Sequence, residues 1–349
     1  MKNIFLFFFL IPFICNAQFE RPNPNQYITK YPDIPRIDAH IHFRDSAPDR
    51  LPNYLNLRDT VMKRSHADIA MWVNLEQNGA QVIQKMTKGR MLSAFSTFRP
   101  AQLGIEHYKE NDIKALYKEG YIGYKIWYGP YYRQGEQPVK YKYIDDPAHE
   151  EAFAELERQG VLLTSLHIAD PNGPYSFRTN WAKEPVDYWR QIIGLERVLS
   201  RHPKLNIVVA HGAWLMTQDA QIDYLRYMME TYPNMNIDIS ATMQYCNLQD
   251  YNNLRDFILS YQDRIMWGYD FTNTPNENNY GSMANSLINW FRFLETDDVF
   301  GENIASNRKP LKGLNLPKSV LEKIYYKNAL RIYPSKLKES MKSLGYPVD

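Results

Sequence analysis

Residues 36–43 read Arg-Ile-Asp-Ala-His-Ile-His-Phe and combine an apolar run with two imidazoles and a carboxylate at alternate positions. In a β-strand, side chains two residues apart share a face, so Asp38, His40 and His42 lie along one side. Two histidines at a strand end can clamp a metal ion. With 8 histidines in 349 residues, however, a His-x-His pair arises by chance in roughly one chain in six. The pair therefore gains meaning only if further ligand types follow other strands.

Similar short apolar runs recur along the chain. There are eight, at residues 36–41, 69–73, 91–95, 121–127, 161–167, 205–210, 235–239 and 264–267. Their mean spacing of about 33 residues is close to the length of a strand-helix-strand unit. Helical patterns lie between or after the runs, at 150–158, 185–199, 219–229, 282–294 and 317–333. This alternation predicts an α/β fold, a (β/α)8 TIM barrel, and no glycine-rich phosphate loop supports a dinucleotide-binding sheet instead.

The first residues predict export. Lys2 precedes twelve apolar residues, 4–15, and Ala17 is a small residue suited to cleavage, so we expect a signal peptide over 1–17 and a periplasmic protein. Lipidation of Cys15 is less favoured because the residues before it are not small. Removal of the signal leaves Cys246 as the only thiol, so a large core has to replace disulfides. We expect an arm over 18–35, a barrel over 36–335 and a C-terminal tail over 336–349.

The charge pattern excludes several classes of partner. The formal net charge is +2, and no basic stripe stands out, so we expect no nucleic acid. No stretch after the signal is long and apolar enough to span a membrane. We expect a small-molecule substrate, and the sequence leaves both a monomer and a homo-oligomer open.

Chemistry in a TIM barrel takes place at the C-terminal ends of the strands, so the last residue of each run is informative. His167 ends the fifth run, His211 follows the sixth, and Asp270 follows the eighth. Lys125 lies in the fourth run among apolar neighbours. Metal-capable groups thus stand at the ends of runs one, five, six and eight, which predicts a metal site at this end of the barrel.

This arrangement resembles the amidohydrolase superfamily, and most closely its amidohydrolase-related (amidohydrolase 2) branch. The resemblance runs from about residue 36 to 333 and rests on the stretches 37–42, 202–212, 232–240, 263–270 and 324–329. It implies that His40, His42, His167 and Asp270 are metal ligands and that His211 acts in catalysis or binds a second metal. Tyr269 departs from the small residue usual in this family, and this departure bears on substrate shape.

The remaining polar residues have several readings. Asp38 is expected to support the ligands, by fixing an imidazole or closing a polar layer, rather than to bind metal. Three roles are open for Lys125: a carboxylated bridge between two metals, a cation that holds a substrate carboxylate, or a member of a structural ion pair. His66, His107, His149 and His202 are read as surface or structural residues.

Aromatic and basic residues follow the fourth and fifth runs. Loops at these positions cover the mouth of a barrel, and their residues would suit a ringed, anionic substrate. The candidate substrate-binding residues are Trp127, Tyr128, Arg133, Arg178 and Trp181. Packing within the loops explains them equally well.

The leading hypothesis is an exported metal-dependent hydrolase that cleaves an ester, lactone or amide bond. One or two divalent ions, Zn²⁺ or alternatively Mn²⁺, would activate water, with Asp270 moving its proton and His211 orienting or protonating the reacting centre. The nearest alternative is a nonoxidative decarboxylase that uses the same site. A non-catalytic binding protein is a third reading, which the intact set of ligands disfavours.

Overall fold

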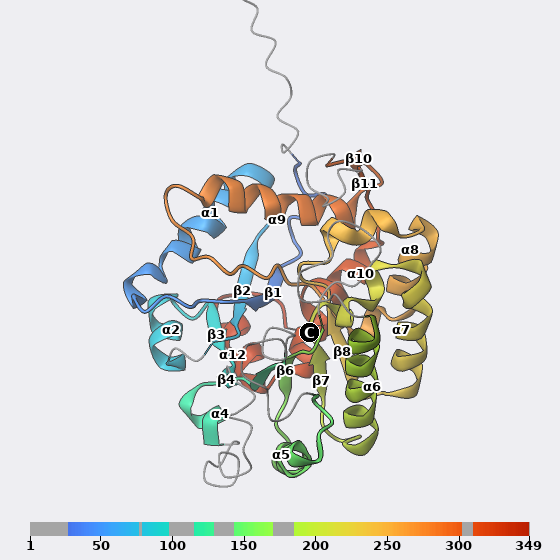
Figure 1. The fold of residues 1–349 in the computed structure, drawn as a ribbon. Helices are drawn as coiled ribbons and strands as arrows, with labels where there is room; N and C mark the ends of the chain where they lie inside the picture. Colours follow the sequence, from blue (N-terminus) through green and yellow to red (C-terminus); the bar gives the residue numbers. More distant parts are fainter. Residues whose placement is uncertain are drawn as a thin grey trace, which may run out of the picture.

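Parallel strands lie at the centre of the molecule and helices surround them (Figure 1). The computed structural model describes residues 27–76, 79–97, 115–128, 143–169, 185–301 and 310–348. One group of parallel strands contains β1 (Arg36–Ile41), β2 (Ile69–Asn74) and β3 (Met91–Ser93). The other contains β4 (Phe95–Thr97), β5 (Tyr124–Trp127), β6 (Leu163–His167), β7 (Ile207–Val209), β8 (Met235–Asp238) and β9 (Ile265–Met266), in this order.

Two junctions join the groups into a closed ring. Ala94 separates β3 from β4, and its amide donates to Asn74 O of β2 at 2.8 Å while the next amide, Phe95 N, donates to Gly123 O before β5 at 2.8 Å. At the other junction, Ala39 N donates to Trp267 O at 3.1 Å and Asp270 N donates to His40 O at 2.7 Å. The eight predicted runs therefore all become barrel strands, with the third divided at Ala94, and the predicted TIM barrel is confirmed.

Where the sequence predicted a helical pattern, the structure has helices with similar bounds, and it also has helices that were not predicted. Asp146 caps α5 by accepting from Ala148 N at 3.0 Å, and Gly160 ends the helix with φ 64°. The helices are α1 (Asn53–Ser65), α2 (Ala80–Met86), α4 (Leu116–Glu119), α5 (Pro147–Gln159), α6 (Pro185–Arg201), α7 (Asp219–Thr231), α8 (Tyr251–Ser260), α9 (Tyr280–Glu295), α10 (Lys318–Glu322), α11 (Asn328–Ile332) and α12 (Ser335–Ser343).

Shorter elements complete the chain. They are the helical turns η1 (Pro48–Arg50), η5 (Ala210–Thr217), η6 (Met243–Leu248), η7 (Gln262–Arg264) and the π-helical η8 (Lys323–Lys327), with the hairpin strands β10 (Val299–Phe300) and β11 (Leu311–Lys312).

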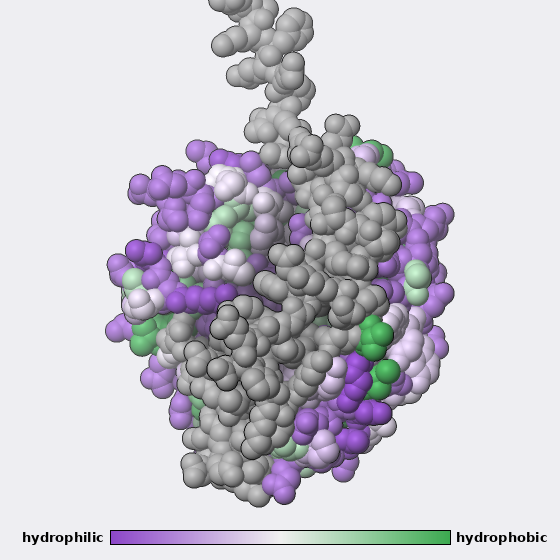
Figure 2. Space-filling model, in the orientation of Figure 1, coloured by the Kyte–Doolittle hydropathy of each residue, from purple (hydrophilic) through white to green (hydrophobic). Residues whose placement is uncertain are grey.

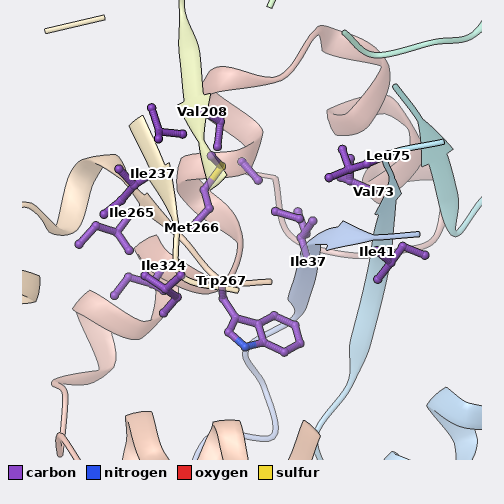
Figure 3. Close-up of a cluster of buried hydrophobic side chains, with 14 of the residues drawn as sticks. Ile37, Ile41, Val73, Leu75, Val208, Ile237, Ile265, Met266, Trp267 and Ile324 are labelled. Carbon is purple, nitrogen blue, oxygen red and sulfur yellow. The ribbon is translucent and has the colours of Figure 1, made fainter. Parts of the chain in front are cut away.

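The strands are buried on both faces, as parallel strands under a helical layer must be. All six residues of β1 and all six of β2 are buried. Figure 3 shows part of the resulting core, in which Ile37, Val208 and Ile237 from three strands meet Trp267, which follows β9, and Ile324 of η8. Branched side chains on one face of β1 therefore pack into the core, while the alternate positions are free to carry the polar residues.

The chain on either side of the barrel also packs onto it. In the expected arm, Thr29 donates a 2.5 Å hydrogen bond to buried Glu295 and accepts one from Arg36 at 2.8 Å. The expected C-terminal tail forms α12, which buries Leu337 and Met341. These contacts make both segments part of the folded unit.

The described surface is mainly hydrophilic on the face drawn in Figure 2, where hydrophobic residues form small separate patches. Among the described residues, none of the helices has the length and apolar character that crossing a membrane requires. The predicted signal segment, 1–17, lies outside the described residues.

Candidate metal centre

Three side chains from opposite ends of the barrel sequence meet at the C-terminal ends of β1 and β9. His40 Nε2 and His42 Nε2 are 3.2 Å apart. Asp270 Oδ1 lies 3.6 Å from His40 Nε2 and 3.3 Å from His42 Nε2. The backbone hydrogen bond from Asp270 to His40 holds the two strand ends together. The structure thus brings three of the predicted ligands within one another's reach.

The two imidazoles have their protons on the nitrogens that face away from this centre. His40 Nδ1 lies 3.0 Å from Asp238 Oδ2, and His42 Nδ1 lies 2.6 Å from Glu76 Oε1. An ionised carboxylate only accepts hydrogen bonds, so each Nδ1 donates, and in a neutral ring this leaves a lone pair on Nε2. Burial lowers the pKa of His40 to about 4, which keeps this ring neutral at physiological pH.

Asp238 is suited to hold His40 in this state. Burial alone would raise its pKa, but the facing His40 and His211 rings, with hydrogen bonds from His40 and Ser240, hold it well below its usual range. Asp238 Oδ1 accepts from His211 N at 3.2 Å, Ser240 N at 3.0 Å and Ser240 Oγ at 2.5 Å. One carboxylate therefore fixes both a ligand ring and the backbone after β7.

This donor set fits a divalent metal. In the neutral rings that metal binding requires, two lone pairs face each other at 3.2 Å, and a cation between them removes their repulsion. The edges of the triangle, 3.2 to 3.6 Å, also match the separation of about 3.3 Å expected between ligands of tetrahedral zinc with bonds of about 2.0 Å. Among the described residues, His40, His42 and Asp270 form one potential metal set, and His40, His211 and Asp238 form another.

His211 and His167 stand beside this set. His211 Nδ1 lies 2.8 Å from the Ser240 carbonyl, which can only accept, so Nε2 carries the lone pair. That Nε2 is 3.9 Å from Asp270 Oδ2 and 3.2 Å from His167 Nδ1. His167, although predicted as a ligand, belongs to neither three-residue set and contacts the centre through His211. Burial lowers the pKa of His211, so its neutral form is favoured.

An unusual backbone turn positions His211. Residues 211–214 all have left-handed φ angles, from 52° to 62°, at His211, Gly212, Ala213 and Trp214. Each non-glycine residue in this region costs about 1–2 kcal/mol, so the surroundings must hold it. Trp214 stacks on the His211 ring at 4.6 Å and donates through Nε1 to Ala169 O at 2.9 Å. The turn presents His211 with its acceptor nitrogen toward Asp270.

Lys125 is buried in β5 and is 2% exposed. Its Nζ donates to Ser165 Oγ at 3.0 Å. Burial lowers the pKa of Lys125 to about 8, against the attraction of Asp270, Glu76 and Asp238. Within the described residues, none of the carboxylates lies at ion-pairing distance from Nζ. The side chain therefore faces the centre as a cation without a direct anionic partner in the described chain.

Asp38 supports the backbone of the centre. Its Oδ1 accepts from His40 N at 3.2 Å and from Tyr269 N at 2.9 Å, so it links β1 to the residue before Asp270. Burial raises the pKa of Asp38 to about 8. The sequence led us to expect that this carboxyl would fix an imidazole or close a polar layer, and its hydrogen bonds instead go to main-chain amides.

The predicted substrate residues are placed differently from one another. The Trp127 ring lies 5.8 Å from the His167 ring, at the edge of the centre. Tyr128 is 1% exposed, and its hydroxyl lies 3.3 Å from His149 Nε2 of α5. Tyr128 thus packs against α5, and its expected contact with substrate stays a prediction. Arg133, Arg178 and Trp181 lie outside the described residues.

Two carboxylates that orient the ligand rings were missed from the sequence. Glu76 lies two residues after the end of β2, and Asp238 is the last residue of β8. Both occupy strand ends, the same positions that singled out His167 and Asp270. Attention to acidic as well as imidazole side chains at strand ends would have found them.

Comparison with known proteins agrees with this geometry. Residues 137–335 match the model of a family described as Amidohydrolase (Amidohydro_2). A search of curated proteins gave no match.

Solved structures of low sequence identity also match this chain. An uncharacterised TIM-barrel protein from Bordetella bronchiseptica is 16% identical, with 88% of this chain and 99% of that chain covered and a TM-score of 0.54. A 2,6-dihydroxybenzoate decarboxylase from Rhizobium is 16% identical over 86% and 98% of the two chains, with a TM-score of 0.45. A zinc-bound amidohydrolase from Burkholderia multivorans is 11% identical over 89% and 99%, with a TM-score of 0.45. From the family match and the barrel, this chain belongs to the amidohydrolase family and is a metal-dependent enzyme.

Proposed function

We propose that the protein is an exported hydrolase that uses a zinc ion to cleave an ester, lactone or amide bond in a small substrate. The observation that carries the proposal is the pair of facing Nε2 atoms on His40 and His42, with the carboxylate of Asp270 beside both. Two imidazole nitrogens and one carboxylate oxygen suit zinc better than the harder magnesium or calcium ions. Three protein ligands leave a further position for water or substrate.

When bound, the metal lowers the pKa of water toward about 7 and polarises a carbonyl oxygen. Asp270 turns Oδ2 away from the two ligand rings and toward His211, so this oxygen can accept a proton from the attacking water. His211 presents a lone pair at Nε2, which makes it a proton acceptor rather than a donor in its resting form. Trp214 keeps that nitrogen aimed at the reacting centre.

A second candidate, nonoxidative decarboxylation, is favoured by Lys125. Its buried ammonium faces the centre without a described ion-pair partner and could hold a substrate carboxylate. In that reaction the same pocket would release carbon dioxide and protonate carbon. The two candidates share the site and differ in their products.

The test begins with metal analysis of the purified enzyme, followed by chelation and return of zinc. Activity is measured on panels of esters, lactones and amides, with carbon dioxide measured on aromatic acids. We expect hydrolysis that disappears on chelation, returns with zinc and is lost in His40→Ala. His66→Asn changes an exposed histidine at the end of α1 and serves as the matched control. Full activity of His40→Ala after chelation would overturn the proposal, and carbon dioxide release would favour the decarboxylase.

We also propose that the enzyme acts in the periplasm. The support is the apolar run 4–15 behind Lys2 and the small residue Ala17. Mass spectrometry of the exported protein should find Gln18 as its first residue. A cytoplasmic protein that retains Met1 would contradict export.

A further inference from the structure

A cavity of about 530 Å³ opens directly beside the metal centre, between η6 and α9. Asp270 lines this cavity and also faces the His40 and His42 rings at 3.6 and 3.3 Å. Any substrate whose reacting bond sits at the metal centre can therefore extend a group into the cavity. The volume falls in the usual range for small-molecule sites, about 300–1,000 Å³.

Asn289 of α9 is the most informative residue of this cavity. It is 7% exposed, lines the cavity, and its amide makes no hydrogen bond with the residues that the structure describes. Neither atom of this amide is sealed from solvent, so water can pair with it in the free enzyme. A substrate group that enters the cavity can take the place of this water. The amide is therefore available to bind a ligand.

The rest of the lining defines the chemistry of that ligand. Gln244 adds a second amide, while Met243 and Trp290 supply apolar surface. Tyr269 is fixed by stacking on Phe271 at 3.7 Å. The side chain of Ser286, also in the lining, is hydrogen-bonded to Tyr269. Of the described lining residues, only Asp270 carries a charge, and it is an anion.

Beyond the metal centre, the described lining offers no cation that would compensate a carboxylate or phosphate for the water it loses. A neutral group that both donates and accepts hydrogen bonds would satisfy the amides of Asn289 and Gln244. The aromatic and apolar walls would cover the flat face of a ring. The lining thus selects a neutral ring that carries hydroxyl groups over an anionic one.

We propose that Asn289 determines specificity by binding a neutral, hydroxylated ring of the substrate in the cavity between η6 and α9. The proposal rests on the proposed function, because it places the reacting bond at the metal centre. The proposal places recognition of the neutral ring on α9 rather than in the loops after β5 and β6. Lys125 would have the different role of binding an anionic group of the substrate.

The experiment compares three substrates that share one scissile bond and differ in one ring substituent: hydroxylated, saturated hydrocarbon of similar size, and carboxylated. For the wild-type enzyme we expect the highest kcat/KM with the hydroxylated ring. In Asn289→Leu, the ratio of kcat/KM for the hydroxylated ring to kcat/KM for the hydrocarbon ring should fall on the order of ten- to a hundredfold, mainly through KM. This loss is the equivalent of one or two hydrogen bonds. Asn285→Leu, on the same helix but outside the cavity lining, should leave the preference unchanged.

Two further measurements keep the test decisive. Asn289→Ser should reduce the preference less than Asn289→Leu, and it replaces that variant if leucine prevents folding. Calorimetry with the hydroxylated and hydrocarbon products measures the same preference without turnover, as a ratio of dissociation constants. An unchanged preference in both Asn289 variants, or a wild-type preference for the carboxylated ring, would overturn the inference. Metal-independent turnover would overturn the proposed function instead, whatever the preference.

Discussion

The substitution Glu76→Gln isolates the carboxylate that orients His42. Glu76 Oε1 accepts from His42 Nδ1 at 2.6 Å and from Arg44 Nε at 2.8 Å. Burial alone would raise the pKa of Glu76, but these two partners outweigh it and lower that pKa, so the side chain is charged at neutral pH. Glutamine keeps the shape and one acceptor oxygen while it removes the charge.

The magnitude follows from the type of hydrogen bond that is lost. A charged acceptor contributes about 1.5–3 kcal/mol and a neutral one about 0.5–1.5 kcal/mol, a difference of about 1–2 kcal/mol. Part of this energy keeps the lone pair of His42 aimed at the metal. Zinc affinity should therefore fall by at most about fivefold to thirtyfold, which overlaps the range seen for partners of metal-bound histidines.

The assay is competition between the metal-free enzyme and a zinc-binding indicator at fixed pH. Glu157→Gln is the matched control, because Glu157 Oε2 lies 3.4 Å from His202 Nδ1 in a similar pair outside the centre. We expect weaker zinc binding in Glu76→Gln alone. Equal zinc affinity in the wild type and both variants would refute the reasoning that the carboxylate tunes His42.

Three further changes test other parts of the site. Lys125→Met should raise the free energy of unfolding near neutral pH by about 3 kcal/mol while activity falls, because burial lowers the pKa of Lys125 from 10.5 to about 8. The unfolded chain binds the proton more tightly than the folded chain, so this gain in stability should shrink as pH rises from about 8 to 10.5. Urea unfolding of both proteins at several pH values measures the trend, and its absence would show that the lysine is exposed. Gly268→Ala should weaken zinc binding, since a Cβ there would lie 2.9 Å from His40 Cβ, and unchanged titration by zinc would contradict this contact. Trp214→Leu should lower kcat on the order of tenfold with zinc content unchanged, because it releases the ring of His211, and parallel loss of kcat and zinc would instead indicate a structural role.

The barrel could be predicted because buried parallel strands leave a strong signal. Each is a short apolar run, and successive runs are separated by helical patterns. The division of the third run at Ala94 could not be predicted, because it depends on which neighbour each amide meets across the ring. His40, His42 and Asp270 could be found since the C-terminal strand ends of a barrel meet in space.

The rest of the site depends on contacts between residues that lie far apart in the sequence. Glu76 and Asp238 contact rings 34 and 198 residues away in sequence. The left-handed turn at 211–214 arises from contacts such as Trp214 to Ala169, which no local pattern reveals. Asn289 lies inside a helix whose apolar pattern marked it only as a closing helix. Recognition of the cavity required the placement of α9 beside η6.

The central claim is that His40, His42 and Asp270 hold a divalent metal. Anomalous diffraction at the zinc edge, on crystals of the enzyme grown with zinc, tests it most directly. We predict a peak within bonding distance, about 2.0–2.2 Å, of both Nε2 atoms and of Asp270 Oδ1, and its loss in His40→Ala. The absence of a peak between these three atoms in crystals of active enzyme would contradict the claim.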